Sequence, residues 1–261
     1  MSTDLAIHDI GEHIVEIRLR RPERLNALGV ATAAALREAV AEAGVRKARV
    51  LLLCGSGRAF CAGADLKERR SMALAERIAH NAAINAAVAA LAAAPCVTIA
   101  VINGLALGGG CELAMACDLR IAAAGIEIGL SECRVGAIPG AGGTQRLPRL
   151  VGLGRALQMM LTGEPVSAER AEVIGLVHEV VPAEQLDERA HALAALLAGR
   201  SPTGLRTIKD LAYRGIELPL AEGLMAERAA VARVLSSADY AEGLAAFAEK
   251  RKPRFGADQT S

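Results

Sequence analysis

The sequence contains no tryptophan and few other aromatic residues, with two tyrosines and three phenylalanines among 261 residues. Because 52% of the chain is nonetheless hydrophobic, its core must be built from Ala, Val, Leu and Ile. The chain also lacks an excess of charge, since 30 Lys and Arg oppose 29 Asp and Glu, a formal net charge of +1. This balance gives no electrostatic basis for a nucleic-acid or membrane partner, and neither is expected.

None of the six cysteines forms a CxxC pair, and no Cys and His grouping has the spacing of a zinc site. The N-terminus carries acidic residues and lacks an apolar signal core. The nearly apolar stretch 82–102 is long enough to cross a bilayer, but Pro95 divides it and Asn85 interrupts it. We therefore expect a buried helix and strand there, no transmembrane segment, no metal and a reducing, cytoplasmic setting.

Hydrophobic periodicity predicts strands that alternate with helices over the first 150 residues. The predicted strands are 5–10, 14–20, 50–54 and 96–102, with further apolar segments near 119–122 and 126–128; the predicted helices are 30–43, 72–93 and one from about 110. This order indicates an α/β fold with a mainly parallel sheet.

After Pro148 the pattern is largely helical. The predicted helices are 153–161, 167–174, 183–199, 201–214, 219–235 and 238–250, with one short strand at 176–180. We expect a core over residues 1–200 and a helical region over 201–261 that packs on the core or on a neighbouring subunit.

Two glycine-rich loops, 55–66 and 103–110, each follow a predicted buried strand, where open α/β sheets bind ligands. Gly108, Gly109 and Gly110 open a predicted helix, so their N–H groups would lie at its electropositive end and suit a developing negative charge. A tight turn needed only for packing is the alternative. Neither loop has the GxGxxG spacing of a dinucleotide site, so nucleotide binding is not expected.

Two glutamates accompany these loops, Glu112 directly after the triple glycine and Glu132 in the segment 128–147. Either one alone could be a helix cap or a solvated residue, but together they form a candidate acid/base pair. No GxSxG motif is present, the five histidines lie outside both loops, and Cys61 and Cys111 have no histidine nearby. Backbone amides with carboxylates suit chemistry through an enolate, in which negative charge develops on a carbonyl oxygen.

Three segments resemble the enoyl-CoA hydratase/isomerase family, the crotonases: FCAGADLKE at 60–68, NGLALGGGCELAMACD at 103–118 and IPGAGGTQRLPR at 138–149. The resemblance runs from RPERLNAL at 21–28 to FAEKRKPRF at 247–255, and it is closest to the hydratase branch that includes methylglutaconyl-CoA hydratase. It implies an α/β crotonase-type ββα spiral core with a C-terminal helical trimerisation region. It also implies an assembly that is a homotrimer or a dimer of trimers.

The resemblance also implies roles for individual residues. Ala64 and Gly109 would donate the two N–H groups of an oxyanion hole, while Glu112 and Glu132 match the two catalytic glutamates. Coenzyme A would be part of the substrate, so no separate cofactor is expected. The implied coenzyme-binding positions are Ala62, Ala64, Asp65, Leu66, Lys67, Phe247 and Lys250, the last two often reaching the coenzyme of an adjacent subunit.

The expected activity is that of an enoyl-CoA hydratase, which adds water reversibly and syn to a 2-enoyl-CoA and gives a 3-hydroxyacyl-CoA. Such enzymes are associated with fatty-acid β-oxidation, although the acyl group and the pathway stay open. An isomerase, which generally relies on one carboxylate, is the nearest alternative, and a catalytically silent relative is another. RNA binding through a lysine-rich helix is a further alternative, but the segment 31–43 contains Glu38 and Glu42 beside Arg37.

One departure from the family pattern concerns the second glutamate. Many relatives have Phe-Gly-x-Pro-Glu at this point, whereas this chain has Ile-Gly-Leu-Ser-Glu at 128–132. Ser131 in place of proline could loosen the turn and shift the carboxylate of Glu132.

Overall fold

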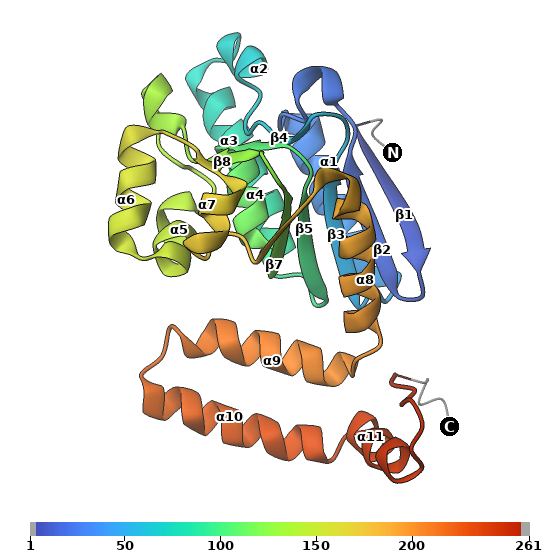
Figure 1. Ribbon diagram of the computed structural model, residues 1–261. Helices are drawn as coiled ribbons and strands as arrows, with labels where there is room; N and C mark the ends of the chain where they lie inside the picture. Colours follow the sequence, from blue (N-terminus) through green and yellow to red (C-terminus); the bar gives the residue numbers. More distant parts are fainter. Residues whose placement is uncertain (1–3, 257–261) are drawn as a thin grey trace.

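The computed structural model describes residues 4–256, which form an α/β fold (Figure 1). The strands are β1 Leu5–Gly11, β2 Ile14–Leu19, β3 Val50–Gly55, β4 Ala59–Cys61, β5 Val97–Ile102, β6 Leu105–Leu107, β7 Leu119–Ala123, β8 Glu127–Gly129, β9 Val166–Ser167 and β10 Glu179–Val181. The helices are α1 Val30–Val45, α2 Leu66–Arg70, α3 Leu74–Ala92, α4 Gly109–Ala116, α5 Gly143–Val151, α6 Leu153–Thr162, α7 Ala168–Val173, α8 Leu186–Ala198, α9 Pro202–Gly215, α10 Leu220–Leu235 and α11 Ala238–Ala248.

Within these residues the strands form two sheets. The larger has the order β1-β2-β3-β5-β7-β10, and the smaller has the order β4-β6-β8-β9. All pairs are parallel except the hairpin β1–β2 and the pair β8–β9. The predicted α/β architecture with a mainly parallel sheet is therefore confirmed.

Successive side chains of β3 point to opposite faces of the larger sheet, and both faces are covered by helices. Leu51 and Leu53 pack in one cluster with side chains of α1 and α3, whereas Val50 and Leu52 pack in a second cluster with α8. Figure 1 shows α8 lying across this second face. Leucine, valine, isoleucine and alanine make up most of both clusters, as the scarcity of aromatic residues requires.

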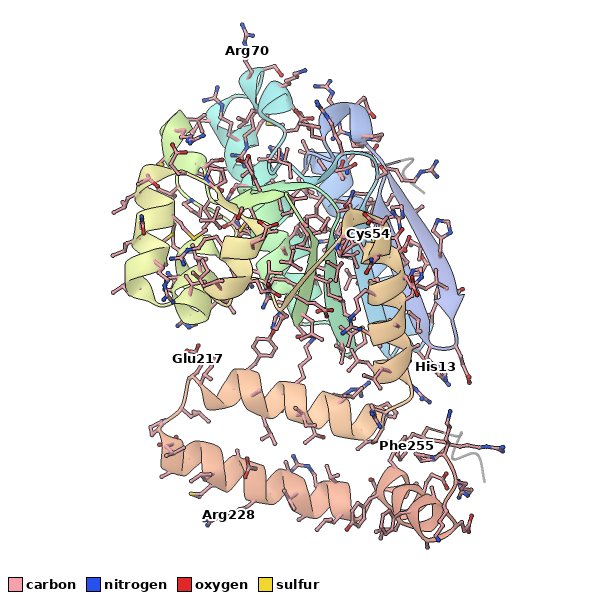
Figure 2. All side chains as sticks on the ribbon, in the orientation of Figure 1. His13, Cys54, Arg70, Glu217, Arg228 and Phe255 are labelled. Atoms are coloured by element: carbon pink, nitrogen blue, oxygen red, sulfur yellow. The ribbon has the colours of Figure 1, made fainter. Side chains whose placement is uncertain are left out.

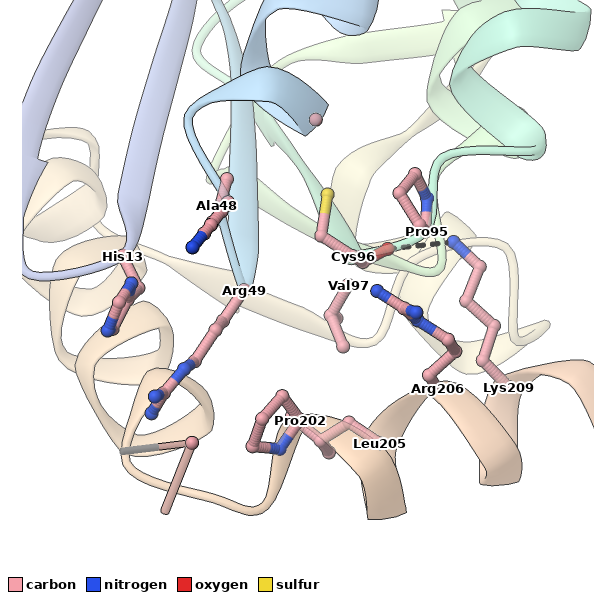
Figure 3. Close-up of a pocket in the computed structure, with 13 residues that line it drawn as sticks. His13, Ala48, Arg49, Pro95, Cys96, Val97, Pro202, Leu205, Arg206 and Lys209 are labelled. Atoms are coloured by element: carbon pink, nitrogen blue, oxygen red, sulfur yellow. Dashed lines mark hydrogen bonds between the residues drawn. The ribbon is translucent and has the colours of Figure 1, made fainter. Parts of the chain in front are cut away.

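The C-terminal helices α9, α10 and α11 extend away from the sheets, beneath the edge at which β3 and β5 begin (Figure 1). Lys209 of α9 ties them to this edge, because its Nζ donates to the carbonyl oxygens of Ala94 and Cys96 and pairs with Asp118 at 2.8 Å. Figure 3 shows Lys209 and Arg206 reaching toward the start of β5 across a pocket of about 270 Å³. This pocket lies between the core and the helical region.

The structure differs from the predicted elements mainly where elements are short. The strands β4 and β6 and the helices α2 and α5 lie in segments for which no regular structure was predicted, and β9 overlaps the start of the helix predicted at 167–174. The strand predicted at 176–180 begins three residues later, at Glu179, and ends at Val181. The segment 82–102 is the predicted helix followed by a strand, and no helix in residues 4–256 is long and apolar enough to span a membrane.

Candidate active site

The two glycine-rich loops pack directly against each other because glycine leaves room for their backbones. A Cβ on Gly110 would overlap the carbonyl oxygen of Cys61, so only glycine fits at this point of α4. Gly63 has a φ of +89°, and a Cβ there would lie 3.0 Å from the amide nitrogen of Gly109. This close approach brings the backbone of Ala64 next to that of Gly109.

The amides of Ala64 and Gly109 are free to bind a ligand. Gly109 is the first residue of α4, where an N–H group has no acceptor within the helix. Beside Ala64, Leu28 donates to Gly63 O and accepts from Asp65 N, which leaves the Ala64 amide unused. Neither amide has an acceptor in the described chain, and both residues line one pocket of about 110 Å³. Two such donors, one of them at a helix N-terminus, are suited to bind an oxyanion.

Glu112 is held in the same pocket as a carboxylate of fixed orientation. It lies in the first turn of α4 and is only 2% exposed. Its Oε1 accepts hydrogen bonds from Ala141 N and Gly143 N, both at 2.7 Å, which leaves Oε2 available. Burial raises the pKa of Glu112, while these two hydrogen bonds act in the opposite direction.

Glu132 lines the same pocket in a different environment. It begins a short 3₁₀ helix, Glu132–Val135, after β8. Its Oε2 is buried without a hydrogen-bond partner among residues 4–256. Burial, with a further contribution from the charge of Glu112, raises the pKa of Glu132 to about 7. The carboxyl group can therefore gain and lose its proton near neutral pH, and it reaches the pocket although Ser131 replaces proline.

Only some residues of the predicted coenzyme-binding segment 62–67 line this pocket. Ala62, Ala64 and Leu66 line it, and the side chain of Lys67 is exposed on α2. Asp65 instead has a structural role as the N-cap of α2.

The Asp65 carboxylate accepts hydrogen bonds from Lys67 N and Glu68 N and pairs with Arg21 at 3.3 Å. Burial opposes ionisation of Asp65, but these hydrogen bonds and the positive charge of Arg21 lower its pKa overall. Its side chain therefore anchors the loop, and any coenzyme contact at this position would come from the backbone.

Phe247 and Lys250 are not brought to the pocket of their own chain. Phe247 lies in α11 and is 85% exposed, and Lys250 follows the end of that helix. Figure 1 shows α11 at the far end of the molecule from α2. Their contact with a coenzyme bound by an adjacent subunit stays a prediction.

Two residues of the pocket, Arg69 and Asn81, were not predicted from the sequence. Arg69 belongs to the charge run Lys67–Arg70, which is typical of a solvated face. A signal was present nonetheless, because Leu66 and Arg69 are three residues apart and share one face of a helix. Asn81 donates to Gly140 O at 3.2 Å and so fixes the loop that holds Glu112.

The other candidate catalysts are inert in this structure. Cys61 and Cys111 are fully buried, and burial raises the pKa of both thiols, that of Cys61 to about 12. In the described part of the chain, no group of three or more His, Cys, Asp or Glu side chains could hold a metal ion.

Arg120 donates hydrogen bonds to carbonyl oxygens at the C-terminal end of α4. It is 2% exposed and donates through Nη1 to the carbonyl oxygens of Cys117 and Ala114, and through Nε to that of Leu176. A guanidinium at a helix C-terminus complements the helix dipole. The helix whose first amide faces the pocket is therefore capped by a positive charge at its other end.

The chain is similar in sequence and in fold to known proteins. The family model described as enoyl-CoA hydratase/isomerase matches residues 9–258. The human protein named enoyl-CoA hydratase domain-containing protein 2, mitochondrial, is 44% identical over 248 residues, which are 93% of this chain and 85% of that protein.

Solved structures of the same family superpose closely on this fold. The enoyl-CoA hydratase of Bacillus anthracis matches with a TM-score of 0.95 and 40% identity, over 98% of this chain and 100% of that one. The enoyl-CoA hydratase of Mycobacterium smegmatis matches with a TM-score of 0.92 and 32% identity, over 97% and 99%. The fold is thus the predicted crotonase fold with its C-terminal helices, and the chain belongs to the enoyl-CoA hydratase/isomerase family.

Proposed function

We propose that this protein is an enoyl-CoA hydratase, which adds water reversibly and syn to a 2-enoyl-CoA and forms a 3-hydroxyacyl-CoA. One observation carries the proposal: two carboxyl groups in different protonation environments face the same pocket as two free amides. A pair of carboxyl groups whose surroundings differ in this way is suited to act as base and acid in one reaction. A double-bond isomerase generally needs only one of them.

In the proposed reaction, the thioester oxygen accepts hydrogen bonds from the Ala64 and Gly109 amides. These bonds polarise the conjugated double bond and make the β carbon electrophilic. Glu112, fixed through Oε1, uses Oε2 to take a proton from a water molecule whose oxygen bonds to the β carbon. Glu132 then delivers its proton to the α carbon, which restores the thioester carbonyl.

The proton balance requires one further transfer after each turnover. Glu112 has gained a proton and Glu132 has lost one, so exchange through solvent at the pocket mouth returns the pair to its starting state. Dehydration follows the same steps in reverse, with Glu132 as base and Glu112 as acid. The oxyanion amides serve both directions because the same enolate-like charge develops in each.

Spectrophotometry tests the proposal, since hydration removes the ultraviolet absorbance of the conjugated thioester. The wild-type protein should bleach pent-2-enoyl-CoA and yield the 3-hydroxy product. Glu132→Gln keeps the size of the side chain but removes the acid, so kcat should fall by about 10²–10⁴-fold while calorimetry still shows substrate binding. Glu127→Gln, an exposed position on β8, is the matched control and should keep full activity.

Two results would contradict hydration. One is near-normal turnover in Glu132→Gln. The other is a wild-type protein that converts pent-3-enoyl-CoA to the 2-enoyl isomer yet incorporates no label from H₂¹⁸O, which would make the protein an isomerase.

A further inference from the structure

The segment 140–143 supplies both hydrogen bonds that hold Glu112, through Ala141 N and Gly143 N. Three of its four residues are glycines, and Gly142 has a φ of +103°. Glycine leaves a backbone many alternative conformations, so the segment cannot hold these amides in place by itself. Each peptide unit is planar, with its C=O and N–H pointing in opposite directions. The groups that fix the carbonyl oxygens of the segment therefore decide where its N–H groups point.

Two asparagines of α3 hold the first of these peptide units. Asn81 and Asn85, one helical turn apart, both donate through Nδ2 to Gly140 O. This carbonyl belongs to the peptide unit whose N–H is that of Ala141. Asn85 is also the polar residue that interrupts the apolar stretch 82–102, and its hydrogen bond to the segment accounts for a polar side chain at that position.

The start of α5 holds the other two peptide units. Gly142 O belongs to the unit whose N–H is that of Gly143, and it accepts hydrogen bonds from two backbone amides in the first turn of α5. The intervening carbonyl oxygen, that of Ala141, accepts a hydrogen bond from Nη1 of Arg146 at 3.0 Å. A Cβ on Gly142 would overlap this Nη1, so glycine is what allows the guanidinium to lie against the segment. All three carbonyl oxygens are thus fixed while the two amides face Glu112.

Asn85 and Arg146 reach the segment from outside the pocket that holds the two glutamates. They line a second cavity, of about 650 Å³, which has Ala141 in common with that pocket. Ala141 is therefore part of the wall between the two cavities. The two side chains act on Glu112 through this wall rather than on a ligand in the pocket.

Arg146 also places a positive charge near Glu112. The side chains that α3 presents to the segment are neutral amides, and the other charged groups that line the pocket are Glu132 and Arg69. On α4 itself, burial keeps the neighbouring thiol of Cys111 protonated. Burial raises the pKa of Glu112, and the two amides together with the charge of Arg146 oppose that rise. Arg146 therefore favours the ionised carboxylate both by its charge and by its hydrogen bond.

We propose that Asn85 and Arg146 are positioning residues of the hydration reaction. They hold the segment 140–143 so that its two amides keep Oε1 of Glu112 fixed and leave Oε2 free to take a proton from water. This inference rests on the proposed hydration. A hydrogen bond accepted at the carbonyl oxygen also polarises a peptide unit, so its N–H becomes a stronger donor to Glu112. Because both residues act from behind the pocket, their loss should affect the chemical step more than substrate binding.

Kinetics of Arg146→Met with pent-2-enoyl-CoA test the proposal. Methionine keeps much of the length of the side chain but removes its charge and its hydrogen bond to Ala141 O. The kcat for hydration should fall by about 10–100-fold, while KM changes less than about threefold. Without the positive charge the pKa of Glu112 rises, so the base becomes protonated at a higher pH. The acid side of the kcat/KM profile, measured between pH 5 and 9, should therefore move to higher pH.

Arg149→Met is the matched control on the same helix. Arg149 lies one turn further along α5 and pairs with Glu217 at 3.2 Å, and Figure 2 shows Glu217 just beyond the end of α9. An exposed ion pair of this kind contributes little, so the variant should keep the kcat and the pH profile of the wild type. Arg146→Lys keeps the charge without the planar guanidinium, so it should restore the acid side of the profile and only part of kcat.

Asn85→Leu tests the other side of the segment. Leucine keeps the size of the side chain but removes the donor to Gly140 O, and Asn81 still donates to that oxygen. The kcat should therefore fall by only about 3–10-fold, and the pH profile should stay in place because no charge is lost. Circular dichroism checks that each variant is folded. If Arg146→Met is unstable, Arg146→Lys and Asn85→Leu still test the inference.

Three results would overturn the inference while hydration stands. One is an unchanged kcat and pH profile in Arg146→Met. Another is a rise in KM at constant kcat, which would make Arg146 a substrate-binding residue. The third is a similar loss in Arg146→Met and Arg149→Met. A wild-type protein that does not hydrate pent-2-enoyl-CoA would instead refute the proposed function, and the inference with it.

Discussion

At the scale of single residues, Glu112 and Glu132 differ in how the protein holds them. Two backbone amides fix one oxygen of Glu112, whereas the buried Oε2 of Glu132 has no hydrogen-bond partner in the described residues. The first arrangement favours a carboxylate and the second favours a protonated acid. This difference makes the proposed reaction depend on pH.

With the pKa of Glu132 raised to about 7, kcat/KM for hydration should fall as the pH rises above about 7, because the acid loses its proton. Dehydration also starts with one proton on the pair, then on Glu112, and the reaction takes up no proton overall, so its kcat/KM should fall over the same pH range. Initial rates in both directions between pH 5 and 9 measure this. A kcat/KM for hydration that does not fall above about pH 7 would rule out the assigned role of Glu132.

The sequence predicted which residues come together better than it predicted which side chains the pocket uses. The motifs around Ala64, Gly109, Glu112 and Glu132 placed all four at one pocket, and the structure agrees. Arg69 was missed because no helix was predicted over Leu66–Arg70, so the helical spacing of Leu66 and Arg69 was not considered.

At the scale of elements, the long buried strands were predictable and the short ones were not. The strands β3 and β5 are continuous apolar segments that follow helices, a pattern typical of a parallel sheet. The strands β4 and β6 have three residues each and lie within the glycine-rich loops, so no alternation of side chains reveals them. Yet these two strands, paired in parallel, align the loops that carry the oxyanion amides.

At Gly110, where the two loops are in contact, we expect that no side chain is tolerated. In Gly110→Ala the new Cβ overlaps Cys61 O, so α4 must move away from β4. We expect the free energy of unfolding to fall by more than about 2 kcal/mol, and activity to fall further because the two amides no longer converge. Urea denaturation and kinetics on pent-2-enoyl-CoA measure the two effects.

Gly154→Ala in α6 is the comparison, because no atom lies within 4 Å of the added Cβ. This change should stabilise the protein by about 0.5–1 kcal/mol, since alanine loses less backbone entropy in a helix. Equal effects of the two substitutions would contradict the close packing of the loops.

At the scale of the whole molecule, the C-terminal helices leave many apolar side chains uncovered. In the structure α9, α10 and α11 bury few residues, and Leu220 and Phe247 are 78% and 85% exposed. Exposed large apolar side chains in such number are typical of a subunit interface. We propose that the chain forms the homotrimer, or dimer of trimers, that its resemblance to the family implies. The human relative is named as mitochondrial, and the cytoplasmic location of this chain stays a prediction.

Sedimentation equilibrium should give three or six times the chain mass of 27.0 kDa. Phe247→Ala should raise the KM for acyl-CoA substrates and leave kcat nearly unchanged, because Phe247 is proposed to touch the coenzyme of a neighbouring subunit rather than the reacting atoms. The variant must first be shown to remain assembled. A monomeric wild-type protein with full activity would refute both the assembly and the role of Phe247.

The positive charge of Arg120 acts on the pocket from the other end of α4. It stands behind α4, a helix of eight residues, so its charge lies about 12 Å from the amide at the front. In an interior without mobile ions, a charge acts over such a distance with little screening. Negative charge at the proposed oxyanion site is therefore attracted by the helix dipole and by the cation behind it, in a field that exists before any ligand binds.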